Sequence, residues 1–168
     1  MDILSSIEAL AFSQWVRESG SIWAFPTILV THTMGMGIVA GLSGMIDLRL
    51  LGMWPEMRIK PLERLFPLIW VAFIVNAITG TMLLVGDAST KLRNPDFYFK
   101  MVLVFIGVIV LRKMQSSVFG SAQVDSAPVS ADAKKLAWVS IACWLGAITA
   151  GRLLAYVGPV AGLVRSGQ

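Results

Sequence analysis

The chain contains a single histidine, His32, which lies inside an apolar stretch that runs from Phe25 to Arg49. An ionisable residue inside an apolar span is a functional candidate by default. The neutral imidazole is a good ligand for haem iron, and a histidine on a transmembrane helix is the usual axial ligand of a b-type haem. The sequence therefore predicts a haem b site with His32 as its axial ligand. Two other roles stay open: a hydrogen bond to Asn76 or Thr79 that fixes helix packing, and a proton relay.

Arg152 is a second ionisable residue inside an apolar stretch, AITAGRLLAY. A buried arginine costs at least about 2.5 kcal/mol on insertion scales, so it needs a partner. In a haem site the partners are the propionates, with Lys100 as a second cation nearby. Two alternatives need no haem. Asp87 can pair with Arg152, helped by stacking on Tyr156, or the arginine can reach the outer headgroups.

Amide and sulfur side chains complete the candidate site. Asn76 is expected in the middle of the second span, where its amide needs a hydrogen-bond partner and His32 is the obvious one. Met36 shares the helix face of His32, and Met36 or Met82 is a candidate second axial ligand. His32 and Met36 with Met34 also resemble a copper(I) site, but Met34 points to another face, so copper ranks behind haem. No Ser-His-Asp, paired-carboxylate or phosphate-loop pattern is present, so we do not expect a stand-alone enzyme.

The composition indicates that these residues are positioned by membrane helices. Of the 168 residues, 56% are hydrophobic and only 14% are charged, against about a quarter charged in soluble domains. Roughly 20 apolar residues cross the ~30 Å hydrocarbon core. The chain is therefore predicted to be a single all-α membrane domain, a four-transmembrane-helix bundle preceded by an amphipathic interfacial helix over residues 1–18. The expected spans are about 26–46, 65–85, 97–117 and 136–157.

The distribution of basic residues predicts the orientation in the membrane. Eight of the 14 lysines and arginines fall in the loops after the first and third spans, and six fall on the other side. Because basic loops stay in the cytoplasm, both termini are expected to be periplasmic. The net charge of +4 comes from these span ends, so the lipid bilayer is an expected partner and nucleic acid is not.

Several longer motifs resemble an uncharacterised family of bacterial four-helix inner-membrane proteins. They are THTMGMGIVAGLSGMIDLRLLG in the first span, AGRLLAY in the last, PLERL before the second and NPDFYFK before the third. The matching positions are His32, Asp47, Arg49, Arg152 and Tyr156. The resemblance covers nearly the whole chain and implies the four-helix architecture but no activity. Small cytochrome b subunits and copper-resistance membrane proteins are a looser analogy, in helix count and a helix-borne histidine.

The leading functional hypothesis is a haem b-binding membrane protein that passes electrons or anchors a redox partner. One histidine per chain implies a homo-oligomer for bis-histidine ligation, unless a methionine supplies the second bond. The spacing Gly37-x-x-x-Gly41 is typical of a close helix–helix contact and predicts that both sides of the first span are packed. A non-catalytic scaffold with a buried network of His32, Asn76 and Arg152 is the main alternative. A copper or small-solute transporter is the third.

Overall fold

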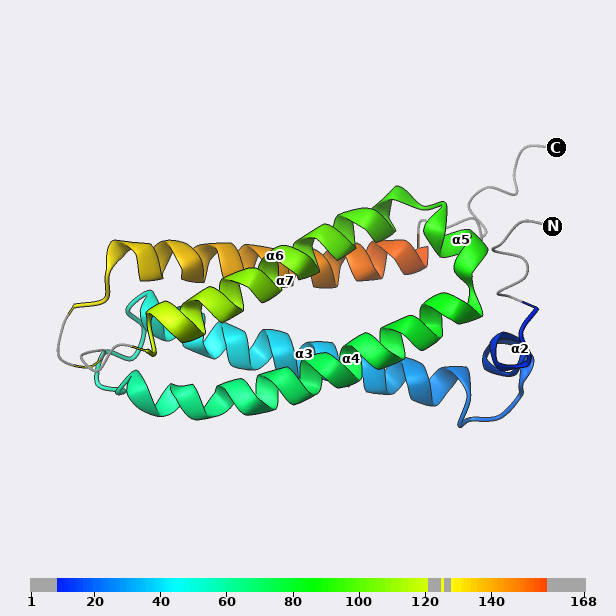
Figure 1. Cartoon of the computed structure of the whole chain (residues 1–168), viewed down its shortest axis with the longest axis horizontal. Coiled ribbons are helices and arrows are strands. Elements are labelled where there is room, and N and C mark those ends of the chain that lie inside the picture. Colours follow the sequence, from blue (N-terminus) through cyan, green and yellow to red (C-terminus); the bar gives the residue numbers. More distant parts are fainter. Residues whose placement is uncertain (1–8, 121–124, 126–127, 157–168) are drawn as a thin grey trace.

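The computed structural model describes residues 9–120, 125 and 128–156, and all regular structure within these ranges is helical (Figure 1). The prediction of an all-α fold is confirmed for this part of the chain. The helices are α2 (Ala11–Glu18), α3 (Phe25–Leu50), the 3₁₀ helix η1 (Lys60–Leu65), α4 (Phe66–Gly86), α5 (Ala88–Leu92), α6 (Pro95–Ser117) and α7 (Ala131–Tyr156).

Proline marks the first turn of three long helices. Pro26, Pro67 and Pro95 lie at the start of α3, α4 and α6, where the missing N–H has no helical partner to lose. Asn94 caps α6 because its side chain accepts a hydrogen bond from the backbone N–H of Asp96 at 2.9 Å. After α3 the chain turns at Gly52, whose φ of 107° is a conformation that side chains with a Cβ rarely adopt. The sequence thus fixes most helix starts locally.

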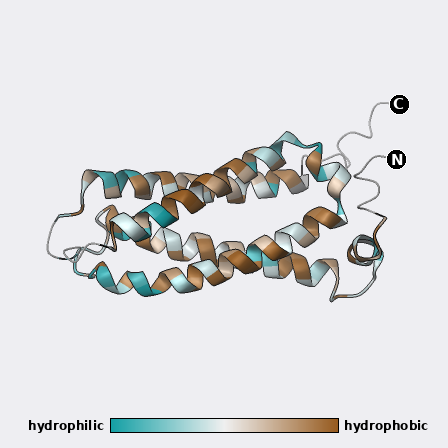
Figure 2. Cartoon of the chain, in the orientation of Figure 1, coloured by the Kyte–Doolittle hydropathy of each residue, from teal (hydrophilic) through white to brown (hydrophobic). Residues whose placement is uncertain are grey.

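Three helical segments are long and apolar enough to cross a membrane: Phe25–Leu50, Lys60–Gly86 and Ala131–Leu154. In each segment, at most 33% of the most apolar stretch is buried inside the protein. The outer faces of these helices are apolar, as contact with lipid requires (Figure 2). The helix α6 differs because Lys100, Arg112 and Lys113 flank its apolar stretch of residues 101–111.

The helices pack as two antiparallel pairs, α3 with α4 and α6 with α7, and the pairs meet chiefly where α3 packs on α7 (Figure 1). The main core extends through both pairs, and Phe66 and Phe119 are fully buried in it. Their rings meet edge to face at a centroid distance of 5.1 Å. In Figure 1, α4 and α6 diverge toward the end of the bundle that carries α5.

The short helix α2 lies across one end of the α3–α4 pair. Val16 is buried with Ile28 and Leu83, and a Cβ added at Gly86 would lie only 3.0 Å from Val16 Cγ1. Residues 1–8 of the predicted interfacial helix lie outside the described residues.

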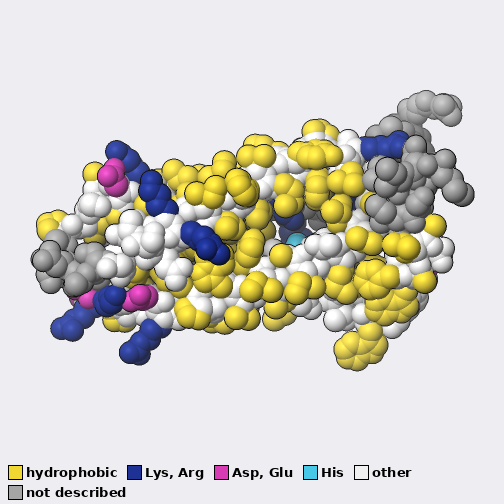
Figure 3. All heavy atoms as spheres, in the orientation of Figure 1, with side chains coloured by type: hydrophobic (Ala, Val, Ile, Leu, Met, Phe, Trp, Pro, Cys, Tyr) yellow, Lys and Arg dark blue, Asp and Glu magenta, His cyan; other side chains and the backbone are white. Residues whose placement is uncertain are grey.

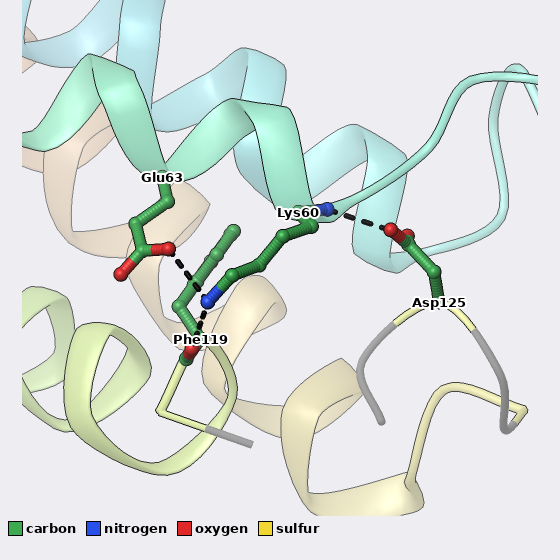
Figure 4. A network of polar contacts seen from close by, with 4 residues as sticks. All are labelled: Lys60, Glu63, Phe119 and Asp125. Atoms are coloured by element: carbon green, nitrogen blue, oxygen red, sulfur yellow. Dashed lines mark hydrogen bonds and ion pairs between the residues drawn. The ribbon is translucent and has the colours of Figure 1, made fainter. Parts of the chain in front are cut away.

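The other end of the bundle is held by a polar cluster of Lys60, Glu63, Phe119 and Asp125 (Figure 4). The Lys60 ammonium donates to the Phe119 carbonyl at 3.0 Å and pairs with Glu63 at 2.7 Å. Asp125 Oδ1 accepts the backbone N–H groups of Ile59 at 2.6 Å and of Lys60 at 3.3 Å. These bonds join the loop before α4 to the segment between α6 and α7.

The prediction that Gly37 and Gly41 pack against another helix of the chain is wrong for the described residues. A Cβ at either residue would meet nothing within 4 Å, and both lie on the exposed side of α3. The close approach of α3 and α4 instead involves Gly35, where a Cβ would lie 3.2 Å from the Ala72 carbonyl oxygen. Positions 35 and 37 are about 200° apart around a helix, so only one of them faces α4.

Candidate functional site

The half-buried imidazole of His32 is bonded to the neighbouring helix α4 through one ring nitrogen. Its Nδ1 lies 3.0 Å from the backbone carbonyl oxygen of Asn76 and 3.2 Å from Thr79 Oγ1. The Thr79 hydroxyl in turn donates to the Val75 carbonyl at 2.8 Å. His32 is therefore oriented by a backbone group and a hydroxyl that are both fixed within α4.

This bonding assigns the tautomer of His32. A carbonyl oxygen only accepts, so Nδ1 must donate its proton to Asn76, and in the neutral ring the lone pair then lies on Nε2. Among the described residues the ring bonds only through Nδ1, which leaves Nε2 without a hydrogen bond. Metal-ligating histidines usually have this arrangement, with the second ring N–H donated to a carbonyl or carboxylate.

Gly80 provides the space for the imidazole. A Cβ at this position of α4 would lie 2.9 Å from His32 Cε1 and 3.4 Å from Nδ1. Real Cβ atoms do not approach so closely, so even alanine at position 80 would move the ring or the helix. Gly35, one turn after His32 on α3, also permits a close approach of the helices, because a Cβ added there would lie only 3.2 Å from Asn76 Cβ.

Two lysines add positive charge near His32. Lys100 of α6 and Lys91 of α5 both act electrostatically on the imidazole. The Lys100 ammonium lies against α7, where a Cβ at Gly151 would be 3.4 Å from Nζ. Lys91 donates a hydrogen bond to the Leu83 carbonyl at the end of α4. Burial lowers the pKa of Lys91 below its ordinary value; Asp87 opposes this shift and Lys100 adds to it.

Figure 3 shows that this side of the molecule is hollowed between the two helix pairs. The cyan of the chain's single histidine and the dark blue of a basic side chain are visible within the hollow. The hollow therefore combines an imidazole nitrogen with positive charge beside hydrophobic side chains, a setting that suits a ligand with apolar and anionic parts.

The remaining predicted residues divide into those near His32 and those away from it. Lys100 lies near enough to act electrostatically on His32. Asn76 also comes close, but through its backbone carbonyl, because its buried side-chain Oδ1 has no hydrogen-bond partner. Met36 is buried in the core cluster with Val39. Arg152 is exposed, so a buried network that includes this arginine does not form. The side chain of Tyr156 lies outside the described part of the chain.

Within the described ranges, no group of three or more histidine, cysteine, aspartate or glutamate side chains could hold a metal ion. Among these side chain types, the hollow thus offers a single nitrogen donor, that of His32.

Three residues of this region were not predicted as part of the site: Gly80, Lys91 and Gly151. The two glycines could have been suspected from the sequence, because a small residue within an apolar span can mark a place where a large side chain from another helix packs. Nothing in the sequence shows which side chain that is.

No protein-family model, curated protein or solved structure matches this chain.

Proposed function

We propose that this chain is a membrane haem b-binding protein in which Nε2 of His32 is an axial ligand of the iron. The observation that supports the proposal is the hydrogen bond from His32 Nδ1 to the Asn76 carbonyl, since it orients the ring and leaves Nε2 without a partner in the described part of the chain. When bound, haem b would supply one-electron oxidation and reduction at the iron. The chain would then pass electrons to, or anchor, a redox partner protein.

The charges around the hollow fit the propionates of a haem. Lys100 and Lys91 both act electrostatically on the His32 imidazole, and Lys91 donates a hydrogen bond to the Leu83 carbonyl. Two propionates would complete the charge balance of two partly buried ammonium groups, which otherwise cost free energy in an apolar setting. Arg152 is exposed on α7, next to Gly151, so it could reach the propionates only from the surface.

The proposal includes the membrane arrangement. We place four helices, α3, α4, α6 and α7, across a bacterial inner membrane, with α2 in the outer interface and both termini periplasmic. The fourth span, α6, is supported by its 23 residues and by the apolar stretch between Lys100 and Arg112, whose long side chains can reach the headgroups from either end. One histidine per chain then requires a second subunit or a methionine for six-coordinate iron.

A second function, a non-catalytic scaffold or assembly subunit, is favoured by a different aspect of the same contact. The bonds from His32 to Asn76 and Thr79 already join α3 to α4 without any ligand. In a scaffold these bonds would serve only to hold the two helices together, and the purified protein would be colourless because it binds no haem.

Haem titration of the full chain in mild detergent tests the proposal. We expect a saturable Soret band at one haem per chain, or one per two chains for a shared site, and its loss in His32→Ala. Met34→Leu is the matched control, because Met34 lies two residues away on the same helix with its side chain 63% exposed. A wild-type protein that binds no haem, with its circular dichroism intact, would leave the scaffold as the function.

A further inference from the structure

A second polar site lies away from the hollow, within the packed interface of α3 and α7. It consists of Ser43 and Asp47, one turn apart on α3, and Ser140 on α7, whose hydroxyl faces the Asp47 carboxylate. All three side chains are at most 1% exposed. Among the described residues, none of their side-chain oxygens has a hydrogen-bond partner at ordinary distance and angle, although the Ser140 hydroxyl is close enough to stabilise an ionised Asp47. Trp144 Nε1, one turn along α7, has no partner there either.

An orphaned set of this kind is unusual in this protein. Threonine hydroxyls in the long helices donate to carbonyls of their own helix, as in Thr31 to Thr27, Thr33 to Leu29, Thr81 to Ala77 and Thr149 to Leu145. Ser43 and Ser140 do not, so their oxygens remain available between the helices. A buried, unpaired carboxylate costs far more free energy than an unpaired hydroxyl. The Asp47 carboxylate therefore needs either a bound cation or a proton.

No cationic side chain among the described residues compensates Asp47. Arg49 on the same helix donates to the carbonyls of Met57 and Pro55. Arg112 of α6 lies over the Trp70 ring at 5.0 Å, and Lys60 bonds to Glu63 and Phe119. An ionised Asp47 would therefore need a positive charge from outside the described residues.

We propose that Ser43, Asp47 and Ser140 form a binding site for a small monovalent cation, of which sodium is the physiological example. The donors are all hard oxygens, which suit such ions, and a single carboxylate balances a single positive charge. A divalent ion would keep an unbalanced charge in an apolar interface. Carboxylates buried in membrane-spanning segments commonly mark ion sites of this kind. The site is separate from the His32 hollow and does not depend on haem.

Isothermal titration of the full detergent-solubilised chain with NaCl tests this site, with choline chloride holding the ionic strength constant. We expect one sodium ion per chain, no binding in Asp47→Asn, and a Kd weakened about tenfold or more in Ser43→Ala and in Ser140→Ala. The control Thr149→Val removes an α7 hydroxyl that is bonded to its own helix, and it should leave the Kd unchanged.

Thermal unfolding provides a readout that does not depend on Asp47→Asn folding well. The wild-type midpoint should rise with sodium but not with choline, and the rise should shrink in Ser140→Ala. If the wild-type chain binds no sodium and unfolds at the same temperature in both salts, the proposal is wrong, and the carboxyl carries its own proton.

Discussion

The Nδ1 atom of His32 lies 3.0 Å from the carbonyl oxygen of Asn76, one span away in the sequence. Because the acceptor is a backbone group, no substitution at position 76 removes it directly. The orientation of the imidazole instead depends on the spacing of α3 and α4, which Gly35 and Gly80 permit. The glycines are therefore as important to the site as the residues that bond to the ring.

Gly80→Ala should displace the His32 ring. The new Cβ would lie 2.9 Å from Cε1, and overpacking of this kind typically costs about 1–3 kcal/mol of stability. We expect a lower unfolding temperature and weaker haem binding, measured by thermal circular dichroism and haem titration. Gly37→Ala, at an open position on the same helix as His32, should leave haem binding unchanged. Equal effects of the two substitutions would contradict the assigned packing.

Thr79→Val should weaken haem binding without removing the axial ligand. The substitution keeps the shape of the side chain but removes the oxygen 3.2 Å from His32 Nδ1. Loss of such a supporting bond typically lowers metal affinity by about 10–100-fold, and the Asn76 carbonyl that remains places the expected loss near the lower end. The comparison is with Thr81→Val, whose hydroxyl donates only to the Ala77 carbonyl.

Lys100→Met should reduce haem affinity and lower the reduction potential, since it removes a positive charge that favours the reduced iron and pairs with a propionate. Potentiometric titration followed by absorbance measures both effects. Lys113→Met, an exposed position near the other end of α6, controls for a general change in charge. A Lys100→Met protein with wild-type affinity and potential would exclude this lysine from the site.

Asp125→Ala tests the polar cluster at the opposite end of the bundle. It removes the acceptor of two backbone N–H groups, at 2.6 and 3.3 Å, and should cost about 1–2 kcal/mol of stability. Faster limited proteolysis between α6 and α7 is the expected readout. Asp132→Ala breaks an ion pair that is 88% exposed on the aspartate side, so it should change stability by less than about 1 kcal/mol.

The helices could be predicted from the sequence because their signals are local. Apolar runs predict where helices form, and Pro26, Pro67 and Pro95 mark where three of them start. The charged residues at the ends of α6 are equally visible in the sequence. What they do not reveal is how the helices rotate against one another.

That rotation decides which candidate residues meet. Gly35 faces α4 whereas Gly37 faces outward, and Lys100 is half-buried whereas Arg152 is exposed. The two residues of each pair are chemically similar, so only the way in which the helices cross decides which of them faces the protein interior. The partner of His32 was also hidden, because a backbone carbonyl leaves no mark in the sequence. The hydrogen bond to Thr79, in contrast, was one of the alternatives that the sequence left open.

Imidazole rescue of His32→Ala tests the central claim most directly, because it separates ligation from helix packing. When haem and imidazole are supplied together to the variant, imidazole should enter the space left by the ring, bind the iron and restore the wild-type absorption spectrum in a saturable manner. A variant whose spectrum already equals that of the wild type, or that binds haem with the same affinity before imidazole is added, would show that His32 is not the ligand.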